Sequence, residues 1–133
     1  MTLLQVIATT DEGTRAALGE ARNLATRLQP DRIVLLVPRV DPSTPLERGA
    51  GENDAIVEGY RRLASQAGVQ VAVRLCACSG LTEAVRWLLP QGSTIVIGGR
   101  RRWWWPTEEQ RIADLLSRTG YTTFFADCTT MPG

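Results

Sequence analysis

The sequence predicts an α/β fold: a doubly wound, five-stranded parallel sheet with helices on both faces. Short apolar runs alternate with segments of helical periodicity along the chain. The run Thr94–Ile97 shows no polar alternation, which is typical of a parallel strand buried on both faces. The 133 residues, 44% of them hydrophobic, match the size of one domain with one core. We therefore expect a single domain over residues 1–133.

The elements follow one another in the order (βα)₄β. The apolar runs predict strands at Leu3–Ala8, Ile33–Val37, Val71–Cys78, Thr94–Ile97 and Tyr121–Ala126. Helices between these strands are predicted from apolar residues at helical spacing. Their inward-facing residues are Ala17, Leu18, Ala21, Leu24, Ala25 and Leu28 in the first helix, Ile56, Tyr60, Leu63, Ala64 and Ala67 in the second, Leu81, Ala84, Val85 and Leu88 in the third, and Ile112, Leu115 and Leu116 in the fourth.

Local signals indicate a long loop and the ends of the last helix. Asp41–Gly51 contains two prolines and two glycines and is expected to be a surface loop. Thr107 and Gln110 have the spacing of a capping box at a helix start. Gly120 stands where a C-terminal cap belongs. The fourth helix should therefore begin at Thr107 and end just before Gly120.

We expect the functional site around Gly98, directly after the fourth predicted strand. In doubly wound sheets, ligands bind beyond the carboxyl ends of the strands, where the strand order reverses. The first and fourth strands lie side by side at that point, so the loops after Ala8 and Ile97 should face each other. Gly98 and Gly99 allow a tight turn and a close approach of the backbone to a ligand.

Three arginines, Arg100, Arg101 and Arg102, follow these glycines. Their guanidinium groups, beside a glycine turn and ahead of a helix N-terminus, can hold a phosphate or a carboxylate. The alternative is a solvated loop whose charges balance Glu108 and Glu109. We favour the alternative, because adjacent arginines point in different directions and cannot all serve one small anion.

Three consecutive tryptophans, Trp103, Trp104 and Trp105, come next. Three indoles on one loop cannot all face one core, so we expect at least one to be exposed. Exposed tryptophan beside arginine is the composition of a protein interaction hot spot, and it also suits stacking on a base. A third possibility is that the indoles fill the crevice between the first and fourth strands. We favour filling or protein contact over base stacking.

The composition gives little support for conventional catalysis. The chain has no histidine, which is the commonest general base and the usual nitrogen ligand of metals. Cys76 and Cys78 share one face of a strand and are interpreted as small buried side chains rather than as a metal or redox pair. Cys128 is expected to be an exposed thiol. We therefore expect no catalytic residues, no metal site and no enzymatic activity.

Charge and hydropathy argue against two classes of partner. A net charge of +1, from 15 basic and 14 acidic residues, gives no global field that attracts nucleic acid or an anionic membrane. No apolar run approaches the roughly 18 residues that span a bilayer, and no basic segment precedes Leu3 and Leu4. We expect a cytoplasmic protein that neither inserts into membranes nor binds nucleic acid.

The chain resembles the universal stress protein family over nearly its full length. The resemblance rests on the order of elements and on local patterns at Val6–Thr9, Thr14–Leu18, Leu36–Pro42, Ser79–Val85 and Ile95–Gly98. It implies a sheet of order 3-2-1-4-5 and homodimers through the last strand, whose unpaired edge suits association with a second copy. In one branch of the family, it also implies ATP bound between strands one and four.

The sequence departs from the signature of that ATP-binding branch. The branch has an aspartate at the end of the first strand and a glycine loop after the fourth: Gly, two residues, Gly, nine residues, then Gly with Ser or Thr. Here Thr9 replaces the aspartate, and Asp11 comes two residues late. Gly98 matches the first glycine, but Arg101 replaces the second, and the closing pair falls near Glu109-Gln110 or Arg111-Ile112. A glutamate there repels phosphates at short range, so we do not expect ATP binding of this type.

Two functions of different classes remain. The preferred one is a non-enzymatic regulatory or interaction module that has lost the ATP site and presents its Trp-Arg loop to a protein partner, as in family domains that accompany membrane transporters. The alternative is a nucleotide-responsive stress protein that binds ATP or AMP in an altered way; slow nucleotide hydrolysis ranks below both. The ligand of the alternative would contact Thr9, Thr10, Asp11, Arg39, Val40, Gly98, Gly99, Arg100 and Arg101.

Overall fold

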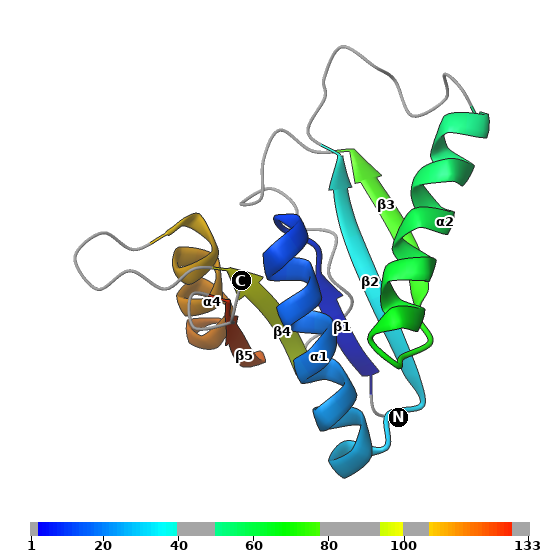
Figure 1. Ribbon diagram of the computed structural model, residues 1–133. Helices are drawn as coiled ribbons and strands as arrows, with labels where there is room; N and C mark the ends of the chain where they lie inside the picture. The colour runs from blue at the N-terminus through cyan, green and yellow to red at the C-terminus, as the bar shows by residue number, and fades with distance from the viewer. Residues whose placement is uncertain (1–2, 40–49, 78–93, 100–106, 129–133) are drawn as a thin grey trace.

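The fold is a five-stranded parallel sheet in the order β3-β2-β1-β4-β5 (Figure 1), which confirms the predicted fold class and strand order. The computed structural model describes residues 3–39, 50–77, 94–99 and 107–128. Its strands are β1 (Leu3–Ile7), β2 (Arg32–Arg39), β3 (Ala72–Ala77), β4 (Thr94–Gly99) and β5 (Thr122–Asp127). The helices within these ranges are α1 (Asp11–Leu28), α2 (Ala50–Gln66) and α4 (Glu108–Arg118).

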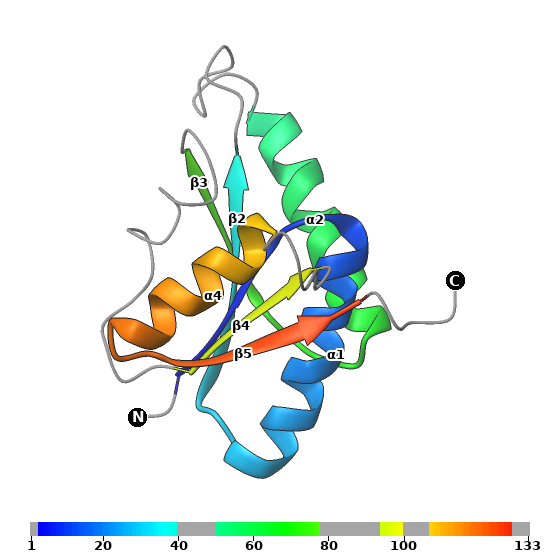
Figure 2. The same ribbon diagram turned by 90° about the vertical axis from the view of Figure 1, so that its left-hand side faces the viewer.

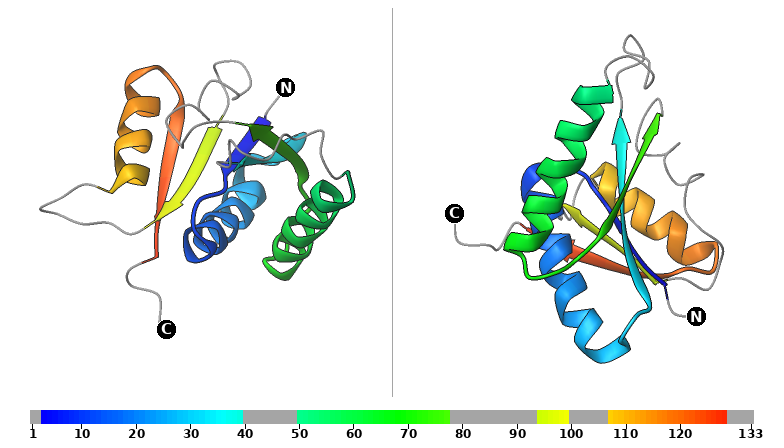
Figure 3. Two further views of the ribbon diagram at one scale, coloured as in Figure 1. Left: turned by 90° about the horizontal axis from the view of Figure 1, so that it is seen from above. Right: turned by 90° about the vertical axis from the view of Figure 1, so that its right-hand side faces the viewer.

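The helices lie on both faces of the sheet, as predicted. Figure 3 shows α1 and α2 on one face and α4 on the other. The two faces have separate cores because successive strand residues point to opposite sides. Leu4 and Val6 of β1 pack with Ala17 and Leu18 of α1, whereas Ile7 belongs to the cluster on the α4 side. The side chains of both clusters are apolar, as expected of a parallel sheet, and Gln5 of β1 is a buried polar residue beside them.

The centre of the sheet brings two distant segments together. β1 pairs with β2 on one side and with β4 on the other, so Ile7 is in register with both Leu36 and Ile97. β5 pairs with β4 and lies at the edge of the sheet (Figure 2). The carboxyl ends of β1 and β4 therefore lie side by side, which is where the sequence places the candidate site.

The predicted ends of the last helix are confirmed. The Thr107 N–H donates to Gln110 Oε1 at 2.9 Å, and the Gln110 N–H donates to Thr107 Oγ1 at 3.3 Å, which together form the capping box. Gly120 has a φ of +103°, and the next N–H, from Tyr121, donates to the carbonyl of Leu116 at 3.1 Å. A left-handed glycine followed by this bond is a Schellman cap.

Several sequence-based details are wrong. Leu28 and Leu115 were expected to be buried but are 42% and 41% exposed. Leu28 is the last residue of α1, and α4 directs Ile112 and Leu116 into the core, which leaves Leu115 on its flank. Cys128 is buried rather than exposed, because its N–H donates to the Gly99 carbonyl at 3.0 Å and continues the pairing of β5 with β4.

The predicted starts of β1 at Leu3 and of β4 at Thr94 are confirmed, and the other strand ends differ from their predicted positions by one or two residues. The predicted helix at 81–89 lies outside the described residues, and so does most of the predicted loop at 41–51. The end of that loop is different from the prediction, because Ala50 and Gly51 already belong to α2.

Candidate functional site

The structure brings two of the predicted site residues into direct contact. Thr9 follows β1, and its Oγ1 donates a hydrogen bond of 2.7 Å to the carbonyl of Gly98 in β4. The Thr9 N–H donates to the buried Thr14 Oγ1 at 3.0 Å. Thr9 therefore joins the start of α1 to the end of β4, and its hydroxyl hydrogen is already used within the protein.

The first turn of α1 also touches β4 through its backbone. A Cβ atom on Gly98 would overlap the carbonyl oxygen of Gly13 and lie 2.8 Å from its carbonyl carbon and 3.1 Å from the nitrogen of Ala17. In the reverse direction, a Cβ on Gly13 would lie 2.6 Å from the Gly98 oxygen. Both positions require glycine, because any larger residue would force the helix away from the sheet.

The prediction of a glycine turn at Gly98 and Gly99 is wrong. Both residues belong to β4, in register with Ala126 and Asp127 of β5. The described residues with left-handed backbone are Gln29, Gly68 and Gly120, so neither Gly98 nor Gly99 needs glycine for its φ angle. Glycine is required here for the close approach of other groups, which is the second of the two reasons the sequence suggested.

Gly99 is covered by an acidic side chain. A Cβ on Gly99 would lie 2.8 Å from Cγ and 3.1 Å from Cδ of Glu109, in the first turn of α4. Cδ is the carboxyl carbon, so this negative group lies directly against the end of β4. Glu109 is half-buried, whereas the adjacent Glu108 is exposed. The sequence comparison with the ATP signature placed a glutamate near this loop, and the structure shows what it contacts.

Both helix N-termini at this end of the sheet are capped by their own threonines. Thr10 Oγ1 accepts from the Gly13 N–H at 3.0 Å, and Thr107 plays the same part for α4. Thr10, a predicted ligand contact, is thus the N-cap of α1. Asp11 is the exposed first residue of α1. Burial raises the pKa of Tyr60 in α2 above its ordinary value, and the nearby negative charge of Asp11 raises it further.

The remaining predicted site residues stay predictions. Arg39 is the last residue of β2, where its backbone is in register with Ala77 of β3. The others lie outside the described residues, so the predictions for them stand untested: Val40, Arg100, Arg101, Trp103, Trp104 and Trp105.

Sequence reasoning missed Gly13 and Thr14 as members of this site. One signal for Gly13 was present, because glycine costs roughly 1 kcal/mol relative to alanine inside a helix and its use there needs a reason. Thr14 carried no such signal, since its burial depends on where α1 lies on the sheet.

The described residues contain neither a candidate metal cluster nor a helix suited to spanning a membrane. The described side chains of His, Cys, Asp and Glu do not gather in groups of three or more that could hold a metal ion. None of the described helices combines the length and apolar character needed to cross a membrane.

Comparisons with known proteins identify the fold. Neither a scan against protein-family models nor a search of the curated proteins finds a match for this chain. Among solved structures, the chain is similar to a universal stress protein from Archaeoglobus fulgidus, with a TM-score of 0.62 and 13% identity, over 94% of this chain and 93% of that one. It is also similar to a universal stress protein in complex with cAMP, with a TM-score of 0.61 and 14% identity, over 96% of this chain and 98% of that one.

Proposed function

We propose that this chain, which has the universal stress protein fold, is a non-enzymatic regulatory module that does not hold ATP in the manner of the family's ATP-binding branch. One observation carries the proposal: the Glu109 side chain lies against Gly99, at the end of the strand from which a phosphate-binding loop would start. In addition, the hydroxyl of Thr9, which stands in the place of an aspartate, already donates to Gly98.

Electrostatics make this arrangement unfavourable for a polyphosphate. Two like unit charges at about 4 Å repel by about 4 kcal/mol at an effective dielectric constant of 20. A triphosphate placed at Gly99 would bring several negative charges toward the Glu109 carboxylate. The bonds from Gly13 to Thr10 and from Gln110 to Thr107 also occupy backbone N–H groups that could otherwise bind an anion at the two helix N-termini.

Calorimetric titration with ATP and magnesium tests this proposal. We expect no binding by the unmodified chain at ligand concentrations of about 1 mM. Glu109→Gln removes the charge and keeps the shape, and we expect it to show saturable binding in the same concentration range. Glu108→Gln is the matched control, because the exposed Glu108 lies beside Glu109 and is not among the atoms nearest Gly99. A dissociation constant below about 100 μM for the unmodified chain contradicts the proposal.

A second candidate function is binding of a less charged adenine nucleotide. The solved neighbour in complex with cAMP favours it, and a cyclic monophosphate carries one negative charge, so its repulsion from Glu109 is smaller. The same titration with cAMP and AMP separates the two candidates. Saturable cAMP binding by the unmodified chain, without ATP binding, favours the nucleotide-responsive candidate over the first one.

For the first candidate, we propose that the segment Trp103–Trp105 contacts the protein partner. We also propose that the protein is cytoplasmic and forms a homodimer through β5. Support for the dimer comes from the position of β5 at the edge of the sheet, because edge strands are where a second copy can add to a sheet. Equilibrium sedimentation across the micromolar range tests it: a single-subunit mass throughout contradicts the dimer. Loss of partner capture in a variant with Trp103→Ala and Trp104→Ala, with the fold intact, supports the tryptophan surface.

A further inference from the structure

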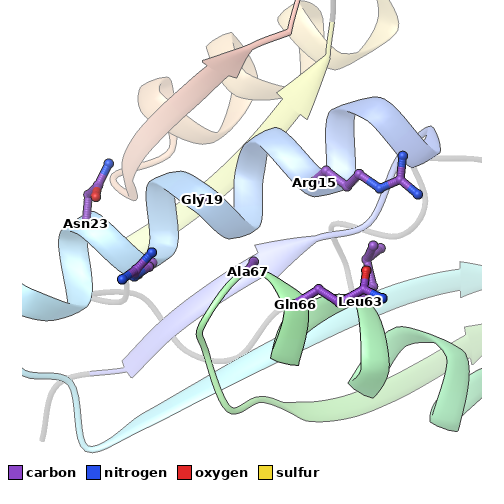
Figure 4. A pocket seen from close by; sticks show the side chains of 7 residues that line it. Arg15, Gly19, Asn23, Leu63, Gln66 and Ala67 are labelled. Carbon is purple, nitrogen blue, oxygen red and sulfur yellow. The ribbon is translucent and has the colours of Figure 1, made fainter. Parts of the chain in front are cut away.

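A cavity of about 360 Å³ lies between α1 and α2, on the opposite face of the sheet from α4 (Figure 4). On the α1 side, it is lined by Arg15, Gly19, Arg22 and Asn23, which form one stripe because they recur at helical spacing. On the α2 side, it is lined by Leu63, Gln66 and Ala67. The cavity thus has a basic and amide-bearing wall facing a partly apolar one.

Glycine creates the floor of this cavity. A Cβ atom built on Gly19 would meet nothing within 4 Å. Gly19 lies between Arg15 and Arg22 in the sequence of α1, so the missing side chain leaves space between two cationic residues. This glycine is not needed for backbone geometry, since its φ angle is that of an ordinary helical residue.

The two arginines of the cavity have no acidic partner among the described residues. Elsewhere on α2, Arg61 forms an ion pair of 2.7 Å with Glu58, but no described carboxylate lies within ion-pair distance of Arg15 or Arg22. Guanidinium groups bind carboxylate and phosphate oxygens through paired hydrogen bonds. Two such groups beside an open space offer charge for an anionic ligand.

The spacing of the arginines separates their charges. They are seven residues apart, which is about 10 Å along a helix axis. The Arg22 side chain is held at the far end of the cavity, where its Nε lies 3.1 Å from the position of a Cβ on Gly68. The last turn of α2 has no basic residue of its own, so Arg22 also places positive charge at that helix C-terminus. The two guanidinium groups therefore mark opposite ends of the cavity.

We infer that this cavity binds a small organic dianion with one acidic group at each end of a short body. Arg15 and Arg22 would pair with the two acidic groups. Gln66 would hydrogen-bond polar atoms between them, and the methyl groups of Leu63 would contact the carbon chain. This site is separate from the ends of β1 and β4, so the inference does not depend on the proposed function.

The test uses nuclear magnetic resonance titration of the full chain with succinate, acetate and inorganic phosphate. We expect succinate to shift the Gly19 amide and the side-chain amide of Gln66, with an affinity at least tenfold higher than that of acetate or phosphate. Equal affinities for the three anions contradict a two-ended site, and no shifts with succinate at about 20 mM contradict any anion site here.

Matched variants localise the site. Gly19→Leu fills the floor and should abolish the succinate shifts, whereas Gly59→Leu on α2, which also meets nothing within 4 Å and does not line the cavity, should leave them unchanged. Arg15→Gln and Arg22→Gln should each weaken succinate binding at least tenfold, and Arg27→Gln, outside the cavity, should not. Binding that survives Gly19→Leu, or that Gly59→Leu reduces equally, overturns the inference.

Discussion

Glycine has opposite structural roles in two regions of this protein: it permits close packing in one and leaves open space in the other. At the junction of α1 with β4, Gly13 and Gly98 are in backbone contact, and Gly99 lies under the Glu109 side chain. Gly19 in the cavity and Gly59 on the exposed surface of α2 meet nothing within 4 Å of a Cβ position. Gly13 and Gly98 are there because no other residue fits between the two backbones, and Gly99 leaves room for the Glu109 side chain. Gly19 and Gly59 instead leave space on helices that would be more stable with alanine.

This contrast separates the structural part of the molecule from the part that is free to bind a ligand. The junction is filled by the protein's own groups, including the bond from Thr9 to Gly98. The cavity between α1 and α2 stays open because position 19 is a glycine, which makes the helix less stable than alanine would.

The largest effect is expected from Gly98→Ala. The added Cβ would overlap the Gly13 carbonyl, and backbone on both sides cannot move aside as a flexible side chain can. We expect a loss of about 3 kcal/mol or more in the free energy of unfolding, measured by urea denaturation. A loss below about 0.5 kcal/mol would show that α1 is not pressed against β4 as described, since surface substitutions have effects of that size.

A smaller effect is expected from Thr9→Val, which keeps the shape of the side chain and removes its hydroxyl. The partly buried Gly98 carbonyl would lose a 2.7 Å hydrogen bond, at an expected cost of about 1–2 kcal/mol in unfolding free energy. Thr26→Val is the control, because Thr26 donates a 3.2 Å bond to the Arg22 carbonyl at an exposed position. Equal losses of unfolding free energy for the two substitutions would mean that the Thr9 hydrogen bond contributes no more to stability than an exposed one.

The sequence predicted the features that depend on neighbours in the chain. Thr107 and Gln110 form their capping box within one helical turn, and Gly120 ends the helix a few residues later, so their residue types carry the information. The alternation of strands and helices was also visible, and the resemblance to a known family supplied the strand order.

Contacts between residues that are distant in the sequence could not be predicted in the same way. Thr9 and Gly98 are 89 residues apart, and nothing near either one indicates that the hydroxyl of one meets the carbonyl of the other. Gly98 was misassigned to a turn because glycine suits both turns and close contacts, and only the position of α1 distinguishes the two. Likewise, the helical spacing of Arg15 and Gly19 is local, but the wall that Leu63 adds to them depends on how α2 packs.

Glycine-to-alanine substitutions in the two groups should change the free energy of unfolding in opposite directions. Gly59→Ala should raise the free energy of unfolding by about 0.5–1 kcal/mol, because alanine is a better helix residue and the added methyl meets nothing. Gly19→Ala should give a gain of similar size. Thermal or urea unfolding of the two variants checks this, and a loss of stability in either would show that its surface is covered in the folded protein.

The smallest effect concerns pH and Tyr60, which lies near Asp11. Burial and the Asp11 charge raise the pKa of Tyr60 in the folded protein above its ordinary value of 10.0. The unfolded chain therefore releases this proton at a lower pH than the folded protein does, and the associated stability is fully present below pH 10 and is lost as the pH rises through the folded pKa. Tyr60→Phe cannot ionise, so its unfolding free energy should fall less steeply above pH 10 than that of the unmodified chain. Parallel curves for the two proteins in urea denaturation between about pH 8 and pH 11 would show that Tyr60 titrates alike in both states, and hence that α2 does not pack closely against the start of α1.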